Sequence, residues 1–431
     1  MKAVWIRCAV YLFILAGLVS VRYARAGEID VLLDVLVDKG VISASEAQSI
    51  RTETYDRMQA EKQKDRQATQ EEIKKTVSEG LNKTMPVLSK TKFSGDMRVR
   101  YQTSETTKTT QTNAGLYRLR LRYGFEMPVN DQVIMGFRMA SGSSADPSST
   151  NQTFDNAFSK RALWIDRAYI QYTGPSWLSM TGGKMPNPFF TTDLVWDPDI
   201  VPEGFLAAST PAISGSTIKP FVYLGYFPVQ ENSSGVFDAS LYAAQIGLTA
   251  APFGKPLKIG IGTYNFAKLK GQKLASVSPN YVKTTNTLDG TGAFVYDYTP
   301  VQYVVEYIPW TFHLADHALP VKLYADFVTN TESGVKDGNG WLYGIKIGDV
   351  KKLWDFQADY NYRKLEADAI PAFISDSDFH NGGTNCKGHK VNIKMGLGKN
   401  VALGATYFST KAITGMRNDF NMWQIDFESK F

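Results

Sequence analysis

The chain has 431 residues, a formal net charge of +5 and only two cysteines. Four of the basic residues lie in the first 26 positions, so the rest is almost neutral and offers no basic surface for nucleic acid. Cys386 is the single cysteine beyond that leader, which excludes an intramolecular disulfide framework. Aromatic residues at 13% and 22 tyrosines favour one large barrel with interfacial aromatic residues over several soluble domains.

The first 26 residues have the form of an export signal. Lys2 and Arg7 precede an apolar run over residues 8–19, and Ala24-Arg25-Ala26 supplies the small-x-small cleavage pattern. The run is shorter than the ~18 apolar residues that a membrane-spanning helix needs. We therefore expect cleavage near Ala26 and a mature chain that begins near Gly27.

Residues 27–90 are predicted to be helical and periplasmic. The first helix has one apolar stripe and ends at Gly40, and Ser43-Ala44-Ser45-Glu46 then has the form of a capping box. The second helix is rich in charged residues and ends before Pro86. Two interpretations stay open: a coiled coil between protomers, or a solvated spacer.

From Phe93 to the C-terminus the chain alternates apolar and polar residues, as β-strands do. Met97, Val99 and Tyr101 alternate with Asp96, Arg98 and Arg100 in the first such segment. The segments are long enough to cross a bilayer at a tilt, which predicts a membrane barrel in residues 91–431 with its polar face towards an aqueous interior.

Connections that alternate between long and short predict sixteen antiparallel strands, wide enough to leave an aqueous channel. The alternation requires one further strand between residues 203 and 213, where the strand signal is weakest. The predicted strands are 93–103, 115–127, 133–140, 162–173, 177–185, 203–213, 217–228, 239–250, 257–267, 297–308, 320–329, 341–349, 353–365, 387–398, 400–411 and 418–431.

The last predicted strand ends in an aromatic residue. Its apolar residues occupy alternate positions and include the terminal one: Trp423, Ile425, Phe427 and Phe431. This arrangement resembles the signal read by the outer-membrane assembly machinery, which we therefore expect as a partner.

Several stretches resemble the putative porin family of Gram-negative outer membranes, whose members carry a helical segment before a general-porin-like barrel. The resemblance lies in residues 33–42, 95–101, 166–170, 182–189 and 197–200. It implies a passive channel for small hydrophilic solutes, a homotrimer, and surroundings of outer-membrane lipid and lipopolysaccharide. A more remote likeness to phosphate-selective porins lacks their dense lysine array.

In trimeric porins the loop after the fifth strand folds into the barrel, and here that loop is residues 186–202. Its acidic residues, with one just beyond, are Asp193, Asp197, Asp199 and Glu203. A basic wall is predicted opposite them: Arg98, Arg100, Arg118, Arg120, Arg122 and Arg138. Opposed carboxylates and guanidiniums would set a transverse field across a narrow aqueous gap. Alternatively, these arginines only solvate the lumen or pair with carboxylates such as Asp96 and Glu126.

No metal, cofactor or catalytic site is predicted. His313, Asp316 and His317 lie in a predicted periplasmic turn, and a second group lies in or beside a predicted external loop: His380, Cys386 and His389. Neither group has a complete ligand set. An enzyme would need a histidine placed beside a nucleophile. The other alternative is a structural tether, in which the helical segment binds a periplasmic partner and the barrel does not conduct.

Overall fold

A computed structural model describes residues 26–84, 89–106, 113–155, 157–230, 238–278, 285–415 and 419–431. The chain divides into two compact units between Ser89 and Lys90. The predicted export signal lies outside the described residues except for Ala26, and so does Pro86. Within the described ranges no helix has the length and apolar character needed to cross a membrane.

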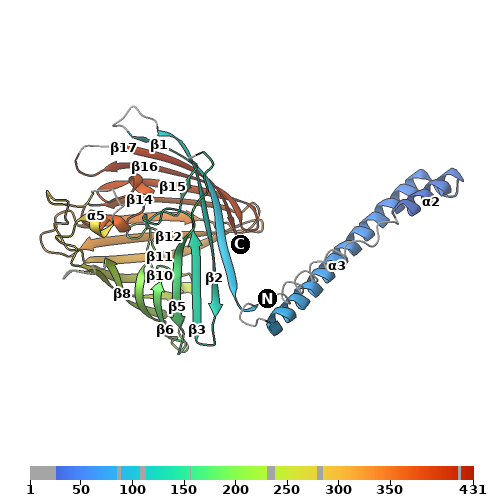
Figure 1. Ribbon diagram of the computed structural model, residues 1–431. Coiled ribbons are helices and arrows are strands. Elements are labelled where there is room, and N and C mark those ends of the chain that lie inside the picture. Colours follow the sequence, from blue (N-terminus) through green and yellow to red (C-terminus); the bar gives the residue numbers. More distant parts are fainter. Residues whose placement is uncertain are drawn as a thin grey trace. The chain divides into compact units, whose positions relative to one another are not determined.

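The first unit is a pair of helices, α2 (Ala26–Asp38) and α3 (Ala44–Thr84) (Figure 1). Gly40 adopts a φ of +67° between them, a left-handed conformation that favours glycine. The Ser43 N–H donates to Glu46 Oε2 at 2.8 Å, and the Glu46 N–H donates to Ser43 Oγ at 3.2 Å, which confirms the capping box. An Arg51–Asp34 ion pair joins the two helices.

The second unit is one closed, antiparallel sheet (Figure 1). Sixteen strands make the wall in the described part of the chain, and a two-residue strand, β4 (Gln152–Thr153), pairs with β2 only. The number of wall strands confirms the prediction. They are β1 (Lys92–Thr106), β2 (Asn113–Pro128), β3 (Val133–Ala140), β5 (Trp164–Tyr172), β6 (Leu178–Lys184), β7 (Glu203–Ser209), β8 (Lys219–Gln230), β9 (Ala239–Ala250), β10 (Leu257–Ala267), β11 (Pro300–Leu314), β12 (His317–Asn330), β13 (Asn339–Ile347), β14 (Phe356–Leu365), β15 (Cys386–Gly398), β16 (Val401–Ala412) and β17 (Asp419–Lys430).

Short helical turns lie in the connections. They are η1 (Pro252–Gly254), α5 (Leu274–Val277), η2 (Ala372–Ile374) and η3 (Phe379–Asn381). The long connections 141–163, 185–202, 268–299 and 366–385 share one end of the barrel, and short turns such as 129–132 and 399–400 lie at the other. In outer-membrane barrels the short turns are periplasmic, so a barrel of that class would have its long connections at the external end.

The barrel closes between its first and last strands. β1 and β17 pair in continuous register from Asp96↔Lys430 to Thr106↔Phe420. Beyond β17, the backbones of Gly95 and Phe431 exchange two hydrogen bonds of 3.1 Å. A Cβ at Gly95 would lie 2.4 Å from the backbone oxygen of Arg122 and 2.4 Å from the Phe431 ring, so the backbone of β2 and the terminal aromatic side chain together favour glycine there.

The two faces of the wall differ as the alternation predicts. On β17, Trp423 and Phe427 are about half exposed, at 50% and 49%, whereas the intervening Gln424 and Asp426 are buried. An outer face of exposed apolar residues is typical of a barrel that spans a membrane.

Two details differ from the sequence prediction. β11 and β12 extend further than expected, so that His313 and His317 are strand residues on either side of a two-residue turn, not turn residues. The strand predicted over residues 203–213 is shorter, Glu203–Ser209. Hairpin strands continue past the hydrocarbon whenever their backbones can still pair, which a hydrophobic pattern does not reveal.

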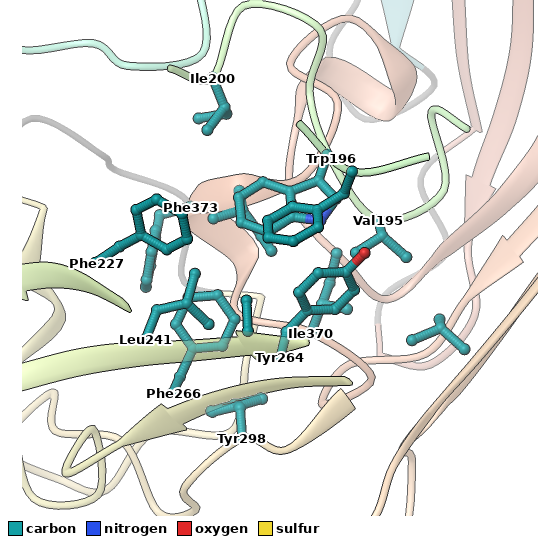
Figure 2. Packing of buried hydrophobic residues seen from close by; sticks show 14 of the residues in the cluster. Val195, Trp196, Ile200, Phe227, Leu241, Tyr264, Phe266, Tyr298, Ile370 and Phe373 are labelled. Carbon is teal, nitrogen blue, oxygen red and sulfur yellow. The ribbon is translucent and has the colours of Figure 1, made fainter. Parts of the chain in front are cut away.

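The interior is polar over only part of the wall. The inward side chains of β7–β10 are mostly apolar or small, among them Leu206, Phe227, Leu241, Tyr264 and Phe266. Residues from loops 185–202, 268–299 and 366–385 pack against them in one cluster, and Figure 2 shows Trp196, Ile370 and Phe373 meeting that wall. The alternation of apolar and polar residues predicts a polar lumen, because water normally fills the lumen. Here loop residues fill this part of the lumen in place of water, so the inward side chains of β7–β10 can be apolar.

We predict an acid-sensitive contact at the periplasmic end. Asp355 accepts hydrogen bonds from His317 Nδ1 at 2.6 Å and from the backbone N–H groups of Lys351 and Lys352 at 2.8 Å. Burial raises the pKa of the Asp355 carboxyl, but these hydrogen bonds outweigh it and lower the pKa to about 2. Because the folded pKa is depressed, this stabilisation is complete above pH ~4 and is lost as the pH falls towards 2.

Asp355→Asn should therefore lower the free energy of unfolding by ~1–3 kcal/mol at pH 7. Urea unfolding of the protein in lipid vesicles would measure this, and the wild type and the variant should converge at pH 2. Asp316→Asn, an exposed carboxylate in the adjacent turn, is the control. A difference between wild type and D355N that persists unchanged at pH 2 would contradict the assignment.

Candidate channel constriction

The constriction loop, residues 186–202, enters the barrel and is fixed to the wall by polar contacts. Gln245 on β9 binds both backbone groups of Phe190: its Oε1 accepts from the N–H and its Nε2 donates to the carbonyl, each at 2.8 Å. Asp326 on β12 accepts from the Thr192 hydroxyl at 2.7 Å and from Gln302 Nε2 at 2.7 Å. Buried partners of this kind fix the loop because leaving them unpaired would be costly.

The acidic residues predicted for the constriction contact different parts of the barrel. Asp193 forms an ion pair of 2.5 Å with Lys390 on β15. Asp197 is buried and accepts a hydrogen bond of 2.8 Å from the backbone of Ser377, in loop 366–385. Thus these two carboxylates do not contact the predicted arginines.

The other two acidic residues also separate. Asp199 reaches the basic wall, with Arg122 Nη1 at 3.0 Å, and accepts hydrogen bonds from the N–H and hydroxyl of Thr150. Glu203 is the first residue of β7, has a 65% exposed side chain and pairs with Lys184 at 2.5 Å. Of the four predicted carboxylates, only that of Asp199 forms an ion pair with a predicted arginine in the described residues.

The centre of the basic wall is Arg100. Its Nε and Nη2 donate to the two carboxylate oxygens of Asp426 at 2.7 and 2.9 Å, and its Nη1 lies 3.1 Å from Asp378 Oδ2. Arg100 and Asp426 are 3% and 5% exposed. Removing one partner of such a buried pair leaves the other charge buried and unpaired, which lowers the free energy of unfolding by ~3–5 kcal/mol.

Neighbouring arginines form a paired network around it. Asp96 bridges Arg120 Nη2 and Arg122 Nε, both at 2.8 Å. Arg98 donates to Asn151 Oδ1 at 2.6 Å and lies 3.9 Å from both Asp426 and Glu428.

The remaining predicted arginines have other partners. Arg138 pairs with Asp166 on β5. Arg118 donates long hydrogen bonds of 3.4 Å to Thr153 and Gln102 and forms no ion pair in the part of the chain that the structure describes. Glu126, the other carboxylate considered for the wall, accepts a hydrogen bond of 2.9 Å from the Tyr169 hydroxyl.

Sequence reasoning missed the partners on the later strands and in loop 366–385. Asp376 binds Arg363 on β14, and Glu428 accepts from Lys394 Nζ at 2.9 Å. Lys390, Lys394, Asp426 and Glu428 lie at alternate positions of β15 and β17, so the same alternation that identified the arginines could have identified them. Asp376 and Asp378 carried no such signal, because an irregular loop does not fix which way its residues point.

The histidines considered as metal ligands are dispersed. His380 Nδ1 is 2.9 Å from Thr410 Oγ1, and His389 Nδ1 is 3.0 Å from the Tyr360 hydroxyl. The Thr410 hydroxyl itself donates to the Phe420 carbonyl. Across the described ranges, no three His, Cys, Asp or Glu residues are grouped to hold a metal ion.

A sixteen-stranded barrel with an inward loop and a charged inner wall defines a transmembrane channel. The family model described as "Putative porin" matches residues 102–298 and 313–431, and the chain belongs to this family. It is therefore an outer-membrane porin, a channel for passive diffusion, and the alternative functions are not favoured.

Solved structures that are similar to this chain include the following three. OprB of Pseudomonas putida is 11% identical, with a TM-score of 0.54 over 79% of this chain and 94% of that one. OmpF of Salmonella typhi, in a complex with daunomycin, is 10% identical with a TM-score of 0.47 over 79% and 97%. DcaP of Acinetobacter baumannii is 16% identical with a TM-score of 0.44 over 79% and 97%. The comparison with curated proteins found no match.

Replacing Arg100 and Arg120 with alanine should shift the reversal potential in a salt gradient towards cation preference. The substitutions remove two positive charges: Asp426 and Asp378 lose Arg100, and Asp96 keeps only Arg122, so the wall becomes more negative. Planar-bilayer recordings measure the shift. Arg161→Ala, at an ion pair in an external loop, is the control, and equal reversal potentials for all forms would remove these arginines from the ion path.

Proposed function

We propose that the protein is a trimeric diffusion channel for small hydrophilic solutes, with its narrowest water path between the constriction loop and the inner face of β11–β15. One observation supports this path above others: its charged side chains are more exposed to solvent than the arginines at the centre of the basic wall. Those of Asp193, Lys390, Lys322 and Glu306 are 24–30% exposed. Those of Arg98 and Arg100 are 9% and 4% exposed, which indicates that the centre of the arginine wall is closed by its own pairs.

A polar cavity of about 170 Å³ occupies the same place. The constriction loop contributes Thr191, Thr192 and Asp193, and the wall contributes Glu306, Lys322, Tyr324, Asp359 and Asn361. Lys322 and Glu306 are paired at 2.8 Å. Asp359 accepts a hydrogen bond of 2.6 Å from Tyr324. A passing ion therefore meets both signs of charge at close range, which gives weak selectivity rather than tight binding.

The finer parts of the proposal rest on the sequence. The leader would be removed near Ala26, and residues 27–90 would form a periplasmic coiled coil or spacer. Trp423, Ile425, Phe427 and Phe431 would present the last strand to the assembly machinery. The exposed outer positions of Trp423 and Phe427 and the pairing of Phe431 with Gly95 support this role.

Single-channel recording of the purified, refolded protein tests the channel and the trimer together. Ohmic conductance steps that occur in groups of three are the expected result. Single independent steps would contradict the trimer. A folded barrel that does not conduct would contradict the open channel and favour the tether.

Asp193→Asn should raise anion preference, because the Lys390 ammonium loses its carboxylate partner beside the water path. Glu203→Gln is a matched control, since it removes one carboxylate from a pair of the same length with Lys184. We expect the reversal potential to change for D193N and not for E203Q. Equal changes in both would show that overall charge, not the proposed path, sets the ion preference.

A further inference from the structure

Three lysines stand side by side on the outer face of the barrel. Lys364 on β14 is the cross-strand partner of Lys387 on β15, which is in turn the partner of Lys411 on β16. The alternation of the strands places all three outward, because the adjacent Arg363, Gly388 and Thr410 are buried on the inner face. We call these three residues the lysine row.

The charges of the lysine row are only partly balanced by neighbouring groups. Lys364 pairs with Glu366 at 2.8 Å, and Asp419 lies opposite Lys411. Lys387, between the two, forms no ion pair among the residues that the structure describes. Directly opposed residues in an antiparallel sheet hold their Cβ atoms ~4.5–5.5 Å apart, where like charges are destabilising. The arrangement therefore favours an anion that could bind between the ammonium groups.

Aromatic residues set the depth of the lysine row in the membrane. Trp341, Tyr343 and Tyr362 stack on one another with ring centroids 5.3–5.8 Å apart, on the strands that carry or adjoin Lys364. Tyr407 and Trp423 make a second contact at 4.5 Å on β16 and β17. Such aromatic clusters mark the interface between hydrocarbon and headgroups.

The lysine row lies at the external side of that interface. Lys364 is one residue from the end of β14, and Lys387 is one residue from the start of β15, where loop 366–385 joins the two strands. At this height the row faces lipid headgroups, not hydrocarbon or lumen water. Lysine is well suited to the site, since its ammonium binds phosphate as a compact charge with three donors.

We propose that the lysine row binds a phosphate group of an anionic glycolipid headgroup in the outer leaflet. The ammonium groups of Lys364, Lys387 and Lys411 donate hydrogen bonds to the phosphate oxygens, and the aromatic clusters below contact the acyl chains. The inference rests on the outer-membrane orientation given above. It makes the lipid a specific partner of one sector of the barrel, away from the channel interior.

The test is binding of a bisphosphorylated glucosamine disaccharide lipid to the full-length, refolded protein in detergent, measured by isothermal titration. Each lysine removed should weaken binding about fivefold, and the triple Lys→Gln variant about a hundredfold. Lys364→Arg, Lys387→Arg and Lys411→Arg together should restore most of the affinity. The control is the same triple Gln change at Lys219, Lys255 and Lys399, exposed lysines of the opposite rim.

Two further measurements distinguish a lipid phosphate from free phosphate, and the loss of the binding site from a variant that fails to fold. The dephosphorylated lipid should bind the wild type as weakly as the phosphorylated lipid binds the triple Gln variant, and inorganic phosphate should compete poorly. Competition by inorganic phosphate at the affinity of the lipid would overturn the lipid assignment. So would unchanged lipid binding by a triple Gln variant that folds, as judged by heat-modifiable migration. Conductance measured on the same preparations reports on the channel independently.

Discussion

Everything in the barrel depends on the pairing of β1 with β17. In hydrocarbon an unpaired sheet edge leaves N–H and C=O groups without partners, at several kcal/mol each. The chain meets this requirement by returning its last strand to its first, over eleven register pairs from Asp96 to Thr106. The same register brings Arg100 opposite Asp426, so that the contact that closes the barrel also builds the centre of the charged wall.

The interior combines two environments that usually occur in different proteins. On one side, loops 185–202, 268–299 and 366–385 pack an apolar cluster against β7–β10, much as a soluble domain builds its core. On the other side, arginines, lysines and carboxylates keep the surface polar. The constriction loop joins the two, because its Trp196 lies in the apolar cluster while its Asp193 and Asp199 reach Lys390 and Arg122.

The sequence alone predicted the strands of the barrel wall better than the loops and contacts inside the lumen. Period-two alternation is local, so it located the strands, their number and the inward arginines. The contents depend on contacts between distant segments: Asp197 is held by Ser377, and Asp199 by Thr150, neither of which a strand pattern can reveal. On β7–β10 the outward positions are apolar as well, among them Leu224, Tyr242 and Ile246, so the pattern gave no indication that the inward side was also apolar. A lumen filled by loops also explains why Arg100 is buried.

The reciprocal pairing of Arg100 with Asp426 has a consequence for how the channel can evolve. The two residues lie 326 positions apart in the sequence, yet each neutralises the other in a place that water hardly reaches. A substitution of either residue alone leaves the other as a buried, unpaired charge. Substitutions of Arg100 and Asp426 should therefore occur as compensating pairs. Positions such as Lys322 and Glu306, where solvent screens the loss, are free to vary singly. New solute preferences should therefore arise near Lys322 and Glu306, while the residues around Arg100 and Asp426 stay unchanged.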